Sequence, residues 1–191
     1  MHYVDLTRDP FVLHYEYMST NQPNPSRLTR ILFYDTNSAV LWLLVRLYLG
    51  YAWLTAGWHK FLDPAWFGTG AGAAIQGFVK GALSKTTGAH PDVSLWYASF
   101  LENVVLPNAG AWSNLITLGE LAVGLGLILG LFTGVAAFFG GFMNVNFLLA
   151  GTVSTNPQLL VLAWLTVLAR RVAGHIGLDR YRKHFSRVFI R

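Results

Sequence analysis

Long apolar runs separated by short polar stretches dominate the chain from about residue 38 onward. A helix needs about 20 residues to cross the hydrocarbon core of a bilayer. The apolar runs therefore predict four membrane-spanning helices, at about 38–60, 112–131, 134–151 and 157–173. Pro157 suits the first turn of the last helix, where a backbone N–H donor is not needed.

The lengths of the links between these runs predict how the helices are arranged. The second and third runs are separated by little more than Phe132 and Thr133, and the third and fourth by residues 152–156. Short links make sequential helices antiparallel neighbours, as in an up-down bundle. We therefore predict an all-α fold, an integral membrane four-helix bundle.

The connection at 61–111 is much longer and carries helical signals of its own. Residues 65–83 are rich in Gly and Ala, which predicts a short amphipathic or re-entrant helix. In residues 93–106 the apolar side chains recur at near-helical spacing, which is typical of a helix lying on the membrane surface. The bundle should therefore carry an additional interfacial or re-entrant helical segment between its first two spans.

The composition supports lipid as the main solvent. Hydrophobic residues make up 53% of the chain and charged residues only 12%, whereas about a quarter of a soluble protein is charged. From Leu121 to Ala169 there is no Asp, Glu, Lys or Arg. The chain has no cysteine, which excludes disulfides, thiol redox chemistry and cysteine-bound iron–sulfur clusters or zinc.

The distribution of basic residues predicts the orientation. The net charge is +5, and half of the 14 Lys and Arg residues follow Ala169. Basic residues beside a membrane helix favour the cytoplasmic side and contact anionic headgroups. We therefore predict a multi-pass protein of the cell membrane with a basic cytoplasmic tail at 174–191, a cytoplasmic N-terminal segment at 1–37 and an outer connection at 61–111. No motif for binding nucleic acid accompanies the charge, so nucleic acid is not an expected partner.

Ionisable groups at membrane depth are few, and each is a candidate functional residue because an unpaired charge there costs a few kcal/mol or more. In the first span, Arg46, Gly50, Trp53, Gly57 and Lys60 recur at intervals of four and three residues. This spacing puts them on one helix face. The glycines on that face allow a neighbouring helix or a ligand to come close.

The second and third spans carry further polar groups at similar depth. Glu120 is expected about 12 Å below the outer end of its span, from roughly eight residues at 1.5 Å each. We therefore predict one pocket in the outer half of the bundle, lined by Arg46, Trp53, Lys60, Glu120 and Asn146. His59 and Asn144 are further candidates for contacting a ligand there.

Each of these groups also has a structural interpretation. Arg46 and Glu120 can form an interhelical salt bridge that fixes the register of the bundle. Lys60 and His59 lie near the end of their span, from which their side chains can reach the headgroups. Asn144 and Asn146 are types of side chain that hold membrane helices together by hydrogen bonds.

Other cofactor chemistry finds little support. The six histidines form no paired metal-binding motif, and only His59 lies near membrane depth, so a haem held by two facing histidines is not expected. Residues 68–72 imitate a glycine-rich dinucleotide loop but lack the preceding strand. We predict no haem, flavin or metal site.

Several of these motifs resemble those of the DoxX family. The first span reads RLYLGYAWLTAGWHK from Arg46 to Lys60, the second contains the pair Gly119-Glu120, and the third contains Asn144 and Asn146. Their order and spacing carry the resemblance, which extends over roughly residues 40–169. Within this family, the long outer connection with its Trp96-Tyr97 pair is similar to that of DoxD-type proteins, the membrane subunit of thiosulfate:quinone oxidoreductase.

The resemblance implies a small membrane subunit of a quinone-linked oxidoreductase that oxidises thiosulfate or another small sulfur compound. Glu120 would then exchange protons at a quinone carbonyl, and Arg46 or Lys60 would stabilise developing negative charge. A quinone entering between the helices would stack near Trp53.

The alternative is a non-catalytic membrane anchor or assembly subunit, bound to a second subunit or to a larger respiratory complex. In that case Arg46 and Glu120 are structural. A small-solute transporter is a weaker third hypothesis, because four spans without an internal repeat leave little room for alternating access.

Overall fold

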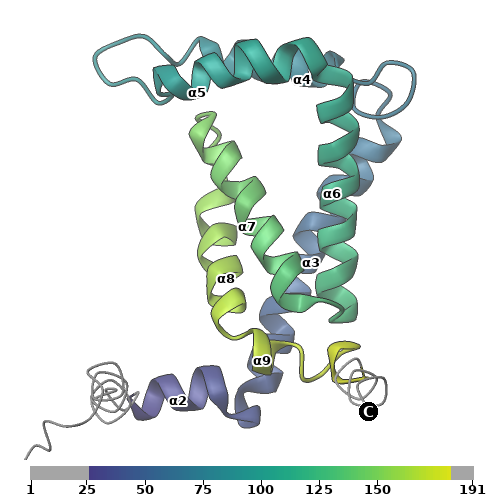
Figure 1. Ribbon diagram of the computed structural model, residues 1–191, viewed down its shortest axis with the longest axis vertical. Coiled ribbons are helices and arrows are strands. Elements are labelled where there is room, and N and C mark those ends of the chain that lie inside the picture. Colours follow the sequence, from purple (N-terminus) through teal and green to yellow (C-terminus); the bar gives the residue numbers. More distant parts are fainter. Residues whose placement is uncertain (1–25, 182–191) are drawn as a thin grey trace, which may run out of the picture.

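The computed structural model describes residues 26–181, and the regular structure in this range is helical throughout (Figure 1). The all-α prediction is therefore confirmed for the described part of the chain. Its α-helices are α2 (Arg27–Tyr34), α3 (Ala39–Leu62), α4 (Ala73–Leu83), α5 (Leu95–Phe100), α6 (Ala109–Leu129), α7 (Thr133–Leu149), α8 (Asn156–Leu168) and α9 (Arg170–Ala173).

The body of the molecule consists of α3, α6, α7 and α8. Helix α3 lies against α6, and α7 lies against α8. Helices α6 and α7 meet at the tight turn of residues 130–132 and diverge toward α4 and α5 (Figure 1). Two apolar helical stretches, Thr36–Leu62 and Leu95–Leu129, are long enough to cross a membrane, while Thr133–Leu149 and Asn156–Leu168 are apolar but shorter.

Glycines bring α3 and α6 into direct backbone contact. A Cβ atom on Gly124 would lie 2.5 Å from the Leu54 nitrogen, and one on Gly57 would lie 2.8 Å from the Leu121 nitrogen. No side chain fits in such an interface, so only glycine permits this approach. Arg46 and Trp53 are buried on the same face of α3, which confirms that the predicted face packs inward.

The predicted connection at 61–111 forms one end of the molecule, where α4 and α5 lie across the ends of the longer helices (Figure 1). The helix expected at 93–106 is confirmed, and the helix expected within 65–83 is α4. Helix α5 continues through a π-helical segment, Leu101–Val105, and a 3-10 segment, Leu106–Asn108, before the chain turns into α6. Pro107 lies in this turn and lacks the N–H that a continuous α-helix would use.

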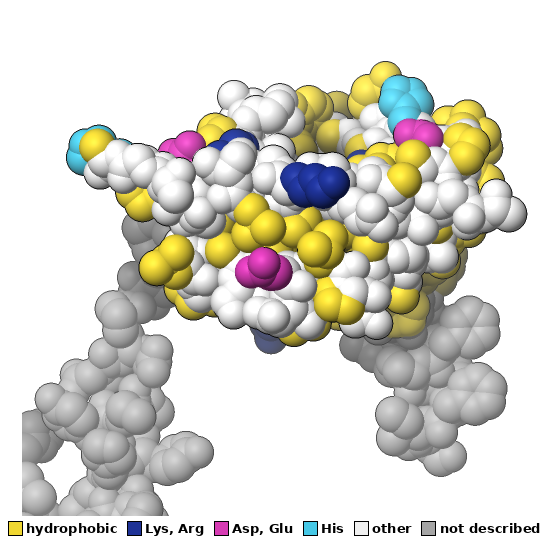
Figure 2. Space-filling model, turned by 90° about the horizontal axis from the view of Figure 1, so that it is seen from above, with side chains coloured by type: hydrophobic (Ala, Val, Ile, Leu, Met, Phe, Trp, Pro, Cys, Tyr) yellow, Lys and Arg dark blue, Asp and Glu magenta, His cyan; other side chains and the backbone are white. Residues whose placement is uncertain are grey.

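Figure 2 looks onto this α4/α5 end. It shows hydrophobic side chains interspersed with isolated acidic and basic ones. Beneath this surface, α4 and α5 bury a small apolar core that contains Ile75, Val79, Tyr97 and Leu101. This end is therefore held by its own hydrophobic packing.

The opposite end is formed by α2, α9 and residues 174–181. We call residues 174–181 the C-terminal strap. The fourth predicted span, 157–173, is two helices, because α8 ends at Leu168 and α9 begins at Arg170. The predicted N-terminal segment 1–37 is described only from Ser26, and the predicted tail 174–191 only as far as Tyr181. Four of its basic residues lie outside the described range, Arg182, Lys183, Arg187 and Arg191.

Candidate functional site

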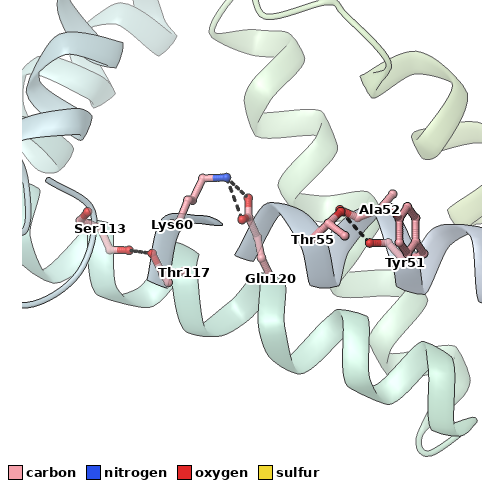
Figure 3. Close-up of polar contacts among 7 residues, drawn as sticks. All are labelled: Tyr51, Ala52, Thr55, Lys60, Ser113, Thr117 and Glu120. Atoms are coloured by element: carbon pink, nitrogen blue, oxygen red, sulfur yellow. Dashed lines mark hydrogen bonds and ion pairs between the residues drawn. The ribbon is translucent and has the colours of Figure 1, made fainter. Parts of the chain in front are cut away.

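A buried ion pair joins α3 to α6 near the α4/α5 end (Figure 3). The Lys60 ammonium donates hydrogen bonds to both carboxylate oxygens of Glu120, at 2.8 Å and 3.0 Å. The Glu120 side chain is 1% exposed and that of Lys60 is 19% exposed. A carboxylate this deeply buried needs such a partner, because an isolated charge would lose its hydration without compensation.

Three residues outside the predicted site surround this pair. The Lys60 ammonium lies 5.0 Å from the centre of the Trp66 ring, close enough for a cation–π interaction. Ser113 donates a hydrogen bond to the Trp66 carbonyl at 2.5 Å, and Thr117 donates one to the Ser113 carbonyl at 2.9 Å (Figure 3). Ser113, Thr117 and Glu120 recur at intervals of four and three on a mainly apolar helix. That stripe was the sequence signal that could have identified them.

Two buried polar groups lie near the ion pair without a hydrogen-bond partner among the described residues. Both amide atoms of Asn144 are unpaired although its side chain is 0% exposed, and the indole N–H of Trp53 is also unpaired. Native proteins leave few buried polar atoms unsatisfied, so each requires an explanation.

Contacts between neighbouring residues place these groups in adjacent layers. A Cβ on Gly140 of α7 would lie 2.9 Å from the Trp53 indole nitrogen, and Asn144 is one helical turn beyond Gly140. A Cβ atom added to Gly119 of α6 would lie 3.5 Å from the Met143 sulfur of α7. Gly119 and Met143 therefore lie at the same depth, and Glu120 and Asn144, each one residue away on these antiparallel helices, lie within about 3 Å of it along the helix axes. We call Lys60, Glu120, Asn144 and Trp53 the polar cluster.

Asn146 and His59 do not join the polar cluster. The Tyr97 hydroxyl donates to the Asn146 carbonyl oxygen at 3.0 Å and contacts its side-chain oxygen at 3.2 Å. The Asn146 amide donates to the Phe142 carbonyl at 2.8 Å. Asn146 therefore connects α7 to α5, as its structural interpretation expects, and His59 is exposed at the end of α3.

Arg46 lies far from the polar cluster, so the expected Arg46–Glu120 salt bridge is wrong. Arg46 precedes Lys60 by 14 residues on one straight helix, which separates them by about 21 Å along its axis. Its guanidinium donates to the Ala173 carbonyl at 3.1 Å and to the Ile176 carbonyl at 2.7 Å. The single pocket expected to contain both Arg46 and Lys60 is therefore also wrong. Residues on one helix face point in the same direction, but they can still lie at very different depths in the membrane.

Asp179, in the C-terminal strap, was not predicted as an important residue. Its carboxylate accepts hydrogen bonds from the Phe132 and Thr133 backbone nitrogens, at 3.0 Å and 2.9 Å, where α7 begins. It caps the helix in the way that a residue just before a helix usually does. Asp179 also interacts favourably with the positive charge of Arg46. Its signal in the sequence was that it is the single acid among the basic residues after Ala169.

Within residues 26–181, no three His, Cys, Asp or Glu side chains are grouped so that they could hold a metal ion. The chemistry of the polar cluster therefore consists of one ion pair and unpaired hydrogen-bonding groups.

Comparison with known proteins identifies a family. The DoxX family model matches residues 41–153, more than half of the chain. No curated protein and no solved structure has significant similarity to the chain. The matched range contains every residue of the polar cluster, together with Arg46 and Asn146. With its long apolar helices, this chain is a membrane protein that belongs to the DoxX family.

Proposed function

We propose that the protein is a membrane subunit of a quinone-linked oxidoreductase and that a quinone carbonyl binds at the polar cluster. The unpaired amide of Asn144, completely buried in the layer of the Lys60–Glu120 ion pair, is the observation that carries this proposal. Leaving a buried polar group unsatisfied costs about 1–3 kcal/mol. A bound ligand that accepts and donates hydrogen bonds would offset this cost.

The groups of the cluster fit the proton chemistry of a quinone. Its reduction to a quinol takes up two electrons and two protons. The Asn144 amide and the Trp53 indole N–H would donate hydrogen bonds to the carbonyl oxygen, and Glu120 would exchange protons with it. The Lys60 ammonium would stabilise the negative charge that develops on that oxygen. Arg46, about 21 Å away along α3, would take no part.

The proposed membrane arrangement has α3, α6, α7 and α8 crossing the bilayer, with α4 and α5 on the outer surface. Helices α7 and α8 have 17 and 13 residues. They would span about 25 Å and 20 Å, less than the hydrocarbon thickness of about 30 Å. The turns at both ends and a local thinning of the bilayer would make up the difference. Both termini would then be cytoplasmic.

The electrons would come from a small reduced substrate or from a second subunit. Thiosulfate is the first donor to test because of the resemblance of the outer connection to that of DoxD-type proteins. Since the chain has no cysteine, a sulfur donor would not be held as a cysteine persulfide on this subunit.

One observation favours a second candidate function, that of a non-catalytic anchor or assembly subunit. Both carboxylate oxygens of Glu120 are already bonded to Lys60, and a purely structural ion pair would have the same geometry.

Quinone retention distinguishes the two candidates and needs no knowledge of the donor. The purified protein in lipid is expected to retain quinone and to reduce a decyl-type quinone when thiosulfate is supplied. Glu120→Gln should lower turnover by about a hundredfold or more, the usual contribution of a positioned proton carrier. Glu102→Gln, at an exposed acid in the π-helical segment before α6, is the matched control. Absence of retained quinone would favour the anchor, and normal turnover by Glu120→Gln would refute its role in proton transfer.

A further inference from the structure

A large apolar groove lies on the side of the molecule between α6 and α7. Its volume is about 890 Å³, near the upper end of the range of about 300–1,000 Å³ for small-molecule sites. Its walls are aliphatic and aromatic, with Leu115, Ala122 and Leu125 on α6 and Val135, Phe139 and Phe142 on α7. Tyr97 and Asn146 contribute polar atoms to its lining.

The groove is closed at both of its ends. Phe100, Leu101 and Val105, in α5 and the segment that follows it, line the outer end, and Leu131 and Phe132 of the α6–α7 turn line the other. Between Trp112 and Leu129 the α6 wall extends about 25 Å, from 1.5 Å per residue. A membrane-spanning helix of a partner would have to pass through α5 to lie along this groove. A flexible chain that ends within the membrane would fit.

The groove also reaches the polar cluster. Gly119 and Met143 line it, and the residues that follow them, Glu120 and Asn144, lie on the buried side of the same two helices. The partition at this point is thin, because Gly119 has no side chain and the thioether of Met143 is flexible. An apolar ligand in the groove would therefore lie next to the buried ion pair.

We infer that this groove binds the isoprenoid tail of a membrane quinone and that the quinone ring passes between Gly119 and Met143 to the polar cluster. This inference rests on the proposed function and adds the route and the tail site. It predicts that the tail contributes directly to binding, beyond concentrating the quinone in the membrane.

The test compares two quinones with the same ring, one with a long isoprenoid tail and one without a tail. Each is measured for retention by the full-length protein in nanodiscs of fixed lipid composition, relative to empty nanodiscs. Ala122→Phe fills the groove at an exposed position of its α6 wall. Ala111→Phe makes the same change at an exposed α6 position outside the groove and serves as the control.

Wild-type protein and Ala111→Phe are expected to bind the tailed quinone more tightly than the tail-less one. Ala122→Phe should weaken binding of the tailed quinone by roughly tenfold, since a tenfold change corresponds to losing the burial of only about two methylene groups. Its binding of the tail-less quinone should not change. In Gly119→Leu, the tailed quinone should remain bound while its reduction is lost, because the passage for the ring is closed.

Two contrary results have different meanings. The tail site would be refuted, and the proposed function would stand, if wild-type protein bound both quinones equally. The same would follow if Ala122→Phe left the binding of the tailed quinone unchanged. Failure of wild-type protein to bind either quinone would refute the proposed function and this inference together. If Ala122→Phe then lost a phospholipid that co-purifies with wild-type protein, the groove would be a site for lipid acyl chains.

Discussion

Lys60 and Glu120 depend on each other because, within residues 26–181, each is the other's only ion-pair partner. The carboxylate is fully buried and takes both of its hydrogen bonds from one ammonium group. Removing one member of such a pair is far more costly than replacing both, because the remaining charge loses its hydration without compensation.

Lys60→Met should therefore destabilise the protein by about 3 kcal/mol, and the double variant Lys60→Met/Glu120→Met should recover most of that loss. The measurement is the free energy of unfolding in lipid or mild detergent. Lys80→Met, at an exposed lysine of α4, should have little effect. A double variant no more stable than the single one would show that the pair is not energetically coupled.

A substitution at Asn144 is expected to affect quinone binding and stability differently. Asn144→Leu should leave the unliganded protein equally stable or raise its stability by about 1 kcal/mol, because an unsatisfied buried amide is replaced by an apolar group of similar volume. The same variant should bind quinone more weakly. Asn146→Leu is the comparison, since it removes the hydrogen bond between the Tyr97 hydroxyl and the Asn146 side chain and should lower stability. A clear loss of stability in Asn144→Leu would mean that this amide already has a partner.

Among the helices, the contact between α3 and α6 depends on the absence of side chains. Gly124→Ala would place a Cβ 2.5 Å from the Leu54 nitrogen, so the two helices would have to separate at a cost of about 1–3 kcal/mol. At Gly81 of α4, an added Cβ would have no atom within 4 Å.

Gly81→Ala should stabilise the protein by up to about 1 kcal/mol, through helix propensity alone. The same substitution thus has opposite signs at the two positions, and thermal unfolding measured side by side is the check. If Gly124→Ala were as stable as Gly81→Ala, the close approach of α3 and α6 would not limit stability.

The helices themselves were largely predictable because apolar length and spacing are local properties of the chain. The runs at 38–60 and 112–131 correspond to α3 and α6, and Pro157 lies in the first turn of α8 as expected. The break at Ala169 was not predicted, because the apolar pattern continues across it.

The candidate site was predictable only in part. The polar face of α3 and the depth of Glu120 identified two members of the ion pair, but not their pairing. Charge and depth predicted Arg46 as the partner of Glu120, whereas the packing of α3 against α6 places Lys60 there. Trp66 and Asp179 reach their partners through tertiary contacts over long sequence separations, which helical periodicity does not encode.

For the whole molecule, the proposed orientation can be tested with single cysteines, because the natural chain has none. Thr87 is exposed at the α4/α5 end and Thr36 is exposed at the opposite end. In intact cells a membrane-impermeant maleimide should label Thr87→Cys, and it should label Thr36→Cys only after permeabilisation. The reverse pattern would invert the orientation, and labelling of both in intact cells would rule out a membrane between the two ends.

The C-terminal strap also has a consequence for biosynthesis. Arg46 enters the membrane with the first long helix, but its partner carbonyl at Ala173 lies 127 residues later. At about 5–20 residues per second, translation would supply that partner roughly 6–25 s after Arg46. During this interval the guanidinium must be hydrated by water or held by headgroups at the bilayer surface. Although Arg46 lies in the first long helix, its guanidinium is therefore among the last groups to obtain their hydrogen-bond partners, and this end of the nascent protein stays open until residues 173–176 have been made.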